Sequence, residues 1–229
     1  ADPKAVRVPG MLVDFVMVAE PADHPQTFGA AFNADYVTAV GTDRLIAPVA
    51  FSERSIIGSR ALAEIRRGDI VNLGIGLPEA VAAVAAEAGR LCEFILTLES
   101  GPIGGVPASG LDFGCSRFPE AIIDQPAQFD FYDGGGLDIA ILGAVEVGPE
   151  GSVNVSSFAG RFAGVGGFMN ITQSAKRLVF CCSFRAGDLE VAMADDGLRI
   201  VREGRHAKFV REPQQICFHG PSAIARGQQ

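Results

Sequence analysis

A short apolar segment that ends in a carboxylate and a glycine-rich turn constrains this chain most. Residues 94–98 are apolar except for Thr97, as in a strand that is covered on both faces of a parallel sheet. Glu99 follows directly, and three glycines lie within the next six residues. Open α/β sheets bind ligands at the carboxyl ends of their strands, where glycine lets the backbone approach closely. Glu99 is therefore the candidate nucleophile.

A second glycine cluster, residues 164–168, is the candidate partner of Glu99. Its sequence is Gly-Val-Gly-Gly-Phe. Such a run can turn several backbone N–H groups toward one point, as a developing negative charge on a carbonyl oxygen requires. Either cluster alone could instead be a plain tight turn. The candidate donors are the backbone amides of Gly164, Gly166, Gly167 and Phe168.

Strand and helix patterns alternate around Glu99. Ser52 can cap a helix that runs toward Arg67, residues 70–73 read as a short buried strand, and residues 78–88 as an alanine-rich helix. After residue 176 strands dominate, and the candidates are residues 178–184, 199–201, 208–210 and 216–218. The predicted fold class is α/β, an open and mostly parallel sheet with helices on both faces and an additional β-rich C-terminal region.

The remaining segments give weaker expectations. Residues 13–18 could form one strand, residues 116–124 a short helix, and residues 129–132 and 137–142 two strands around a turn at residues 133–136. Residues 153–155 add another strand. Residues 1–51 are predicted to be a linker or arm, and residues 52–229 one catalytic domain. Neither a GxGxxG nor a P-loop motif is present, which disfavours a dinucleotide or nucleotide triphosphate site.

Composition excludes several function classes. The formal net charge of −8 speaks against a nucleic-acid binder, and no apolar run is long enough for a membrane span. The five cysteines show neither a secreted framework nor a CxxC spacing, which fits a reducing cytoplasm. The three histidines are scattered, so no metal is expected.

Taken in order, the motifs resemble a known family. They are residues 69–78 (DIVNLGIGLP), 99–101 (ESG), 110–114 (GLDFG), 129–138 (FDFYDGGGLD) and 164–168 (GVGGF). Together they are similar to the second, catalytic (beta) half of family I CoA-transferases, most of all to the propionate or acetate CoA-transferase type. The resemblance runs from about Val8 to the end of the chain.

The resemblance implies a reaction and its participants. Glu99 would attack an acyl-CoA and then carry coenzyme A as a glutamyl thioester, with Gly164, Gly166, Gly167 and Phe168 contacting the CoA. Acyl-CoA and short-chain carboxylic acids would be the substrates, and coenzyme A a co-substrate rather than a tightly bound cofactor. A homologous first-half polypeptide would complete the active site in a homo- or hetero-oligomer. The chain would then be a separate subunit, a processed product or a fragment, because the family pattern continues beyond residue 229.

Two other functions stay open. An acyl-CoA hydrolase would use water instead of an acid to resolve the same thioester, and a related fold could be a catalytically silent ligand-binding or interaction module. The acidic chain must also hold the anionic CoA through local features. Arg161, Lys176 and Arg177 flank the second glycine cluster and are either such contacts or solvated surface residues.

Overall fold

The computed structural model describes residues 2–24, 29, 31–39, 50–158, 160–194 and 197–228. The chain divides into two compact units, Ala1–Phe32 and Asn33–Gln229. The predicted boundary between residues 51 and 52 stays a prediction, and residues 40–49 lie outside the described part. In the second unit, Asp35 and Tyr36 already join the main body: the Phe118 amide donates to the Asp35 carbonyl (2.7 Å), and the Tyr36 hydroxyl to Asp112 (2.9 Å).

The first unit contains single 3₁₀ turns. These are η1 (Pro3–Ala5), η2 (Gly10–Leu12) and η3 (Pro21–Asp23). The strand expected at residues 13–18 is wrong, because these residues pair with no other strand among the described residues. An extended apolar segment becomes a strand only when a neighbour takes its backbone hydrogen bonds.

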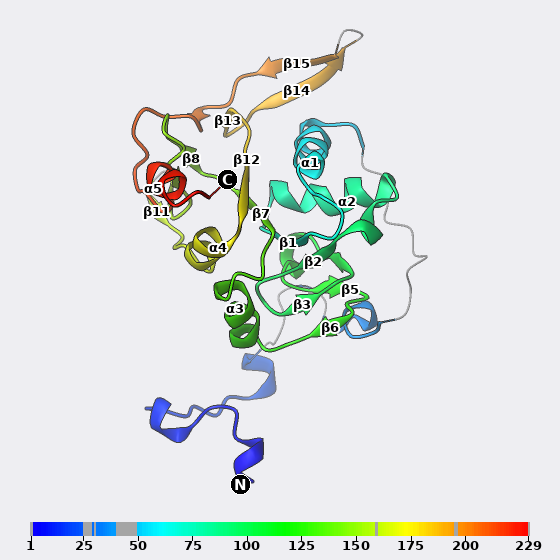
Figure 1. Cartoon of the computed structure of the whole chain (residues 1–229), viewed down its shortest axis with the longest axis vertical. Helices are drawn as coiled ribbons and strands as arrows, with labels where there is room; N and C mark the ends of the chain where they lie inside the picture. The colour runs from blue at the N-terminus through cyan, green and yellow to red at the C-terminus, as the bar shows by residue number, and fades with distance from the viewer. Residues whose placement is uncertain are drawn as a thin grey trace. The chain divides into compact units, whose positions relative to one another are not determined.

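The second unit is built on a six-stranded sheet (Figure 1). The first four strands in spatial order are parallel, and the last two are antiparallel to their neighbours. This mostly parallel arrangement confirms the predicted fold class. The order is β12 (Arg177–Cys181), β7 (Ile139–Gly143), β1 (Ile70–Leu73), β2 (Ile95–Thr97), β3 (Pro102–Ile103) and β6 (Ala121–Ile122).

Alternating side chains of the strands enter two separate cores. Ile139 and Ile141 of β7 pack with α1 (Glu53–Ala63) and α2 (Ala80–Glu87), while Ala140 and Leu142 pack on the other face. The helices of that second core are α3 (Gln125–Asp133), α4 (Phe168–Ser174) and α5 (Gly220–Ala225). Helices therefore cover both faces of the sheet.

The strand order creates a crevice beside β1. After β1 the chain crosses through α2 to β2 on one side, and later returns to β7 on the other side. Neighbouring connections then leave the strand ends in opposite directions, and such a topological switch point opens a ligand site at the carboxyl ends of the strands. Here the crevice lies after Leu73 of β1 and Gly143 of β7.

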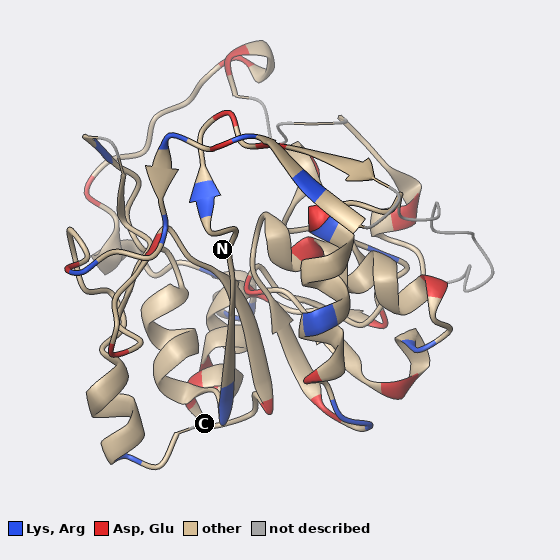
Figure 2. Ribbon diagram, turned by 90° about the horizontal axis from the view of Figure 1, so that it is seen from above, with Lys and Arg blue, Asp and Glu red and all other residues tan. Residues whose placement is uncertain are grey.

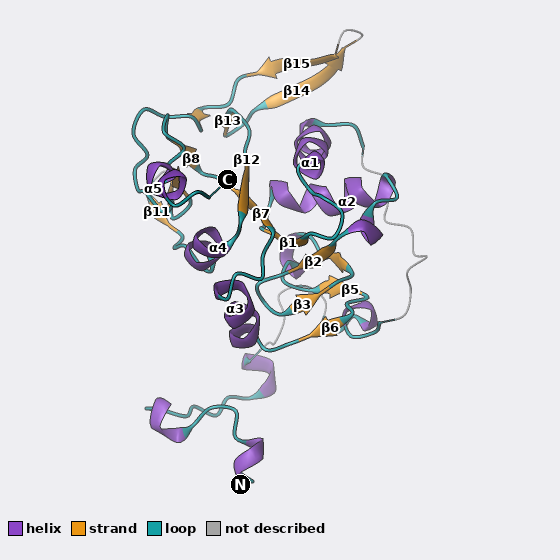
Figure 3. Ribbon diagram, viewed as in Figure 1, coloured by secondary structure: helices purple, strands orange, loops and turns teal. Residues whose placement is uncertain are grey.

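Short antiparallel pairs fill the rest of the second unit (Figure 3). Two of the five pairs lie after β12, which agrees with the predicted β-rich C-terminal region. The pairs are β4 (Val106–Pro107) with β5 (Ser116–Arg117), β8 (Glu146–Val147) with β9 (Val153–Asn154), β10 (Ser157–Phe158) with β11 (Arg161–Phe162), β13 (Arg185–Ala186) with β16 (His206–Ala207), and β14 (Glu190–Ala194) with β15 (Gly197–Arg202). Single 3₁₀ turns are η4 (Ala34–Tyr36), η5 (Leu77–Glu79), η6 (Leu91–Glu93) and η7 (Gly110–Asp112).

Several sequence expectations are wrong in detail. Residues 116–124 form β5 and β6 instead of a helix, and residues 129–132 belong to helix α3 instead of a strand. Pro126 sits in the first turn of α3, where its missing N–H costs nothing, and Gln128 and Tyr132 share one buried face a turn apart. Residues 208–210 and 216–218 contribute only isolated bridges, from Phe209 and Phe218.

Basic and acidic residues are interspersed along the described elements (Figure 2). The amino ends of the parallel strands carry paired charges: Arg177 Nη2 donates to Asp69 (2.5 Å) and Lys176 Nζ to Asp138 (2.7 Å). Burial alone would raise the pKa of the Asp138 carboxyl, but hydrogen bonds from Lys176 and from the Ile70 amide outweigh it and lower that pKa. Within the described residues, no helix has both the length and the apolar character for a membrane crossing.

Candidate active site

Glu99 lies in the turn that directly follows β2, at the carboxyl end of the sheet. Its side chain is half-buried and, among the described residues, accepts no hydrogen bond and forms no ion pair. Burial raises the pKa of the Glu99 carboxyl, since no neighbouring donor or cation stabilises the charged form. A carboxylate so poorly solvated is a stronger nucleophile than one in water.

The second glycine cluster lies against Glu99. A Cβ built on Gly167 would overlap Oε2 of Glu99 and the ring of Phe129, and one built on Gly166 would lie 4.0 Å from Oε1. Gly166 also has φ of +53°, a backbone conformation that favours glycine. The structure thus brings Glu99 and two of the predicted glycines together. Gly164 and Phe168 line the same cavity.

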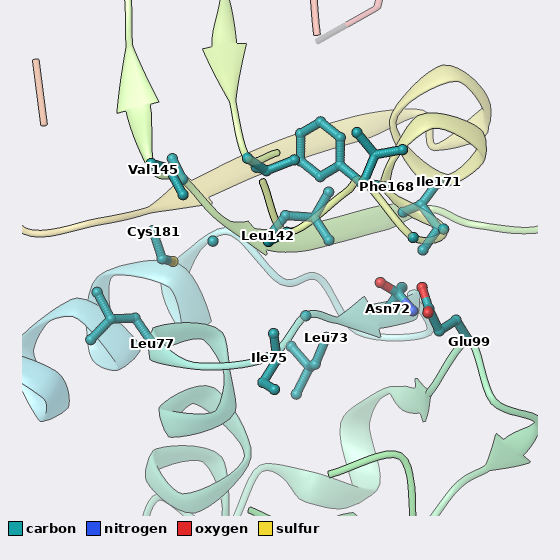
Figure 4. Close-up of a pocket in the computed structure, with 18 of the residues that line it drawn as sticks. Asn72, Leu73, Ile75, Leu77, Glu99, Leu142, Val145, Phe168, Ile171 and Cys181 are labelled. Atoms are coloured by element: carbon teal, nitrogen blue, oxygen red, sulfur yellow. The ribbon is translucent and has the colours of Figure 1, made fainter. Parts of the chain in front are cut away.

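That cavity, of about 540 Å³, occupies the switch-point crevice (Figure 4). Its walls come from the ends of β1 and β7, from the turn after β1 and from the second glycine cluster. Glu99 and Asn72 lie at one end in Figure 4, while Val145, Leu77 and Cys181 lie at the other. Much of the remaining lining is apolar: it includes Leu73, Ile75, Leu142, Val155, Phe168 and Ile171.

A second hollow, of about 390 Å³, shares Glu99, Gly166 and Gly167 with the first. Its other lining residues, Gln125, Pro126, Phe129 and Asn170, come from α3 and α4. Glu99 therefore faces two spaces at once. A reacting carboxylate in that position can receive one ligand from each side.

A buried hydrogen-bond network supports β1 and β2 beneath the site. The Tyr132 hydroxyl, which is fully buried, donates to Thr97 Oγ1 (2.9 Å) and accepts from Asn72 Nδ2 (3.1 Å) and Gln128 Nε2 (2.8 Å). Thr97 in turn donates to the Val71 carbonyl (3.0 Å). The network fixes the two strands that position Asn72 and Glu99.

Sequence reasoning missed two polar residues of the cavity wall, Asn72 and Lys208. Asn72 carried a signal, because an amide within an otherwise apolar strand needs a buried partner or a ligand. Lys208 carried none, since its approach to the cavity depends on how the C-terminal segment folds back.

The basic residues that flank the second glycine cluster do not reach the cavity. Lys176 and Arg177 form their ion pairs at the amino ends of the strands, opposite Glu99, and Arg161 is an exposed residue of β11. The suggestion that they contact the anionic ligand is thus wrong for Lys176 and Arg177. The amino and carboxyl ends of a strand are separated by the whole length of the strand.

The cavity also contains a thiol, but an unreactive one. Burial raises the pKa of Cys181 to about 11, so its thiolate is scarce at neutral pH. Among the described residues, no three His, Cys, Asp or Glu side chains gather closely enough to hold a metal ion. Of Glu99 and Cys181, Glu99 is therefore the available nucleophile.

Comparison with known proteins identifies relatives over nearly the whole chain. The acetate CoA-transferase YdiF of Escherichia coli O157:H7 is 42% identical over 229 residues, which cover 98% of this chain and 42% of that protein. The caffeate CoA-transferase of Acetobacterium woodii is 41% identical and is matched over 99% of this chain and 44% of its own length. No family model matches the sequence.

Solved structures agree with these sequence matches. The apoenzyme of acyl-CoA transferase YdiF superimposes with a TM-score of 0.80 at 40% identity, and its thioester complex with CoA with 0.78 at 41%. Each comparison covers 99% of this chain and 42% of that chain.

A shorter match extends to enzymes that are divided into subunits. The beta subunit of acetate CoA-transferase from Escherichia coli K12 is 30% identical over 144 residues, 58% of this chain and 64% of that subunit. The chain spans less than half the length of the single-chain relatives, and it also matches a beta subunit. The chain therefore belongs to the family I CoA-transferases, as a counterpart of their second, beta-like half.

Proposed function

We propose that this chain carries the reacting half of an enzyme that moves coenzyme A between a short-chain acyl-CoA and a carboxylic acid. The observation that supports this most is the position of Glu99, an unpaired and half-buried carboxylate that borders two cavities beside Gly166 and Gly167. The relatives named acetate and caffeate CoA-transferase support the reaction class.

Glu99 acts as the nucleophile in this proposal. Its carboxylate attacks the acyl-CoA carbonyl, which forms a mixed anhydride and releases CoA as a thiolate. The thiolate attacks the Glu99 carbonyl, so the first acid leaves as a carboxylate and a glutamyl-CoA thioester remains. An acceptor carboxylate then reverses the two steps and leaves as the new acyl-CoA, and Glu99 is regenerated.

The backbone of the second glycine cluster stabilises the oxyanions of these steps. Each attack places negative charge on a carbonyl oxygen, and the amides of Gly164, Gly166, Gly167 and Phe168 are the proposed donors and CoA contacts. Loss of one such donor costs about 3 kcal/mol of transition-state stabilisation. Gly167 matters most in this set, because a side chain there would occupy the space of the Glu99 carboxylate.

The same proposal covers the other participants. Coenzyme A enters as a co-substrate, and no tightly bound cofactor takes part. A polypeptide that corresponds to the first half of the relatives completes the site, so residues 52–229 form the second-half domain of a cytoplasmic homo- or hetero-oligomer. We call this combination the assembled enzyme.

The test is covalent trapping on Glu99. The assembled enzyme, given a short-chain acyl-CoA without acceptor, should gain the mass of CoA less water on the peptide that contains Glu99. Glu99→Gln should abolish the adduct, because an amide is a far weaker nucleophile of nearly the same size. Glu87→Gln, at an exposed position of α2, is the matched control and should form the adduct normally.

Two results would contradict the proposal. An adduct that maps to a cysteine, or full transfer by Glu99→Gln, would remove Glu99 from the reaction. A protein that releases the acid from acyl-CoA with no adduct and no transfer to an acceptor would be an acyl-CoA hydrolase instead.

A further inference from the structure

Lys208 is the one lysine or arginine among the described residues that line the larger cavity. It lies just after β16, and two backbone hydrogen bonds fix its position: its amide donates to the Phe184 carbonyl (2.9 Å), and its carbonyl accepts from the Val147 amide (2.8 Å). The C-terminal segment thus brings a cation to the wall of a cavity that the sheet forms.

The Lys208 ammonium lies at the end of the cavity away from Glu99. Its Nζ donates to the carbonyl of Ala144 (3.1 Å), the neighbour of Val145. Figure 4 shows Val145 at the opposite end from Glu99, with apolar side chains between them. The cavity therefore has a nucleophile at one end and a positive charge at the other.

That positive charge has no direct counter-ion among the described residues. Glu146, the carboxylate that acts on Lys208 electrostatically, is buried and accepts from Asn154 Nδ2 (2.7 Å) and from the Gln214 amide (2.8 Å) instead. The Phe158 ring lies 5.8 Å from the ammonium. Burial lowers the pKa of Lys208, and Glu146 and Cys182 only partly offset this effect. An ammonium in such surroundings gains from an anionic ligand.

We propose that Lys208 binds the diphosphate of coenzyme A. This inference rests on the proposed function, because Glu99 fixes where the sulfur of CoA must lie. In CoA a long, uncharged pantetheine arm separates that sulfur from the diphosphate. The cavity has the matching order of features: Glu99 for the sulfur, an apolar lining for the arm, and Lys208 for the diphosphate. Two of the three N–H bonds of the ammonium remain for phosphate oxygens after the one to Ala144.

Binding of CoA and of pantetheine, which lacks the phosphates, tests this assignment. Calorimetry with the assembled enzyme should show that Lys208→Met weakens CoA binding by roughly tenfold, as for a lost charged hydrogen bond. Pantetheine should bind the variant and the wild type equally. Lys208→Arg should keep most of the CoA affinity, and Lys176→Met, which removes a cation at the far end of the sheet, should change neither affinity.

Other results would overturn the proposal. Equal weakening of both ligands by Lys208→Met would mean that Lys208 contacts the pantetheine arm or only supports Ala144. Unchanged CoA affinity, or an assembled enzyme that binds neither ligand, would remove Lys208 from CoA binding. Because these experiments need no acyl transfer, Lys208-dependent CoA binding without an adduct on Glu99 would reject the proposed function and keep this inference.

Discussion

The Glu99 carboxylate is poorly solvated, and this has two opposite effects on the protein. Burial raises its pKa, so the folded state binds a proton over a pH range in which the unfolded chain has already lost it. Stability therefore falls as pH rises through that range. The same ionised form is the one that reacts.

We therefore expect Glu99→Gln to be at least as stable as the wild type at pH 7. Thermal denaturation of the variant should give an equal or higher Tm, and the difference should vanish at a pH low enough to protonate the wild-type carboxyl. Glu87→Gln should show no such pattern, because Glu87 is exposed. A Glu99→Gln variant that is clearly less stable at pH 7 would mean that the carboxylate has stabilising partners.

The same shift sets the expected pH dependence of activity. The nucleophile must be ionised, so kcat/KM for acyl-CoA should fall as pH drops through the Glu99 pKa, with a midpoint above the ordinary value for a glutamate. Initial rates at saturating acceptor measure this. A profile that stays flat down to the range of ordinary carboxyl groups would contradict it.

Gly167 gives the third prediction at this scale. Gly167→Ala places a methyl group where Glu99 Oε2 and Phe129 lie, so we expect a loss of transfer of about 100-fold or more, as for a misplaced reacting group. Gly164→Ala is the comparison. It strains a backbone at φ +81° but meets no atom within 4 Å, and its effect should be smaller. Equal losses would indicate that backbone strain, not contact with Glu99, limits both variants.

At the scale of elements, the Tyr132 hydroxyl joins α3 to β1 and β2. Tyr132→Phe removes the acceptor of the buried Asn72 amide and one of the two acceptors of the Gln128 amide, so we expect a loss of about 1–3 kcal/mol in the free energy of unfolding. Urea denaturation with an unchanged m-value measures it. Tyr36→Phe, which removes one partly buried hydrogen bond to Asp112, is the control and should cost less. Similar losses would show that the network is not cooperative.

The sequence predicted the parallel strands well and the connections poorly. Residues 70–73 match β1 residue for residue, because a buried parallel strand is a mostly apolar run between turn signals. The strand predicted at residues 129–132 is wrong, since a four-residue segment with three aromatic residues fits a strand and a helix equally. Only the hydrogen bonds of Gln128 to the Leu98 carbonyl and of Tyr132 to Thr97 decide between them.

The residues of the candidate site were likewise only partly predictable from the sequence. Glu99 and the second glycine cluster could be found because both follow local patterns, and the structure brings them together. Lys208 could not, because more than 100 residues separate it from Glu99 and its position depends on the pairing of a short C-terminal segment. Local sequence does not encode that pairing.

For the whole molecule, the charges at the amino ends of the strands should act on stability alone. Arg177 donates to both Asp69 and the Glu64 carbonyl, and its side chain is largely buried. Arg177→Met should cost about 2 kcal/mol of unfolding free energy, as for charged hydrogen bonds, and leave kcat unchanged. Arg202→Met, at an exposed pair in β15, should cost far less. If the fully folded Arg177→Met variant had a changed kcat, the charges at the amino ends of the strands would affect catalysis as well as stability.

The two edges of the sheet can therefore evolve independently. At the amino ends of the strands the charged side chains pair with one another, so substitutions there affect only the stability of the fold. At the carboxyl ends Glu99 has no partner, so substitutions there affect the reaction. A lineage could exchange ion pairs to suit a warmer habitat without disturbing its chemistry, or remodel the walls around Glu99 for a new acid while the opposite edge holds the fold in place.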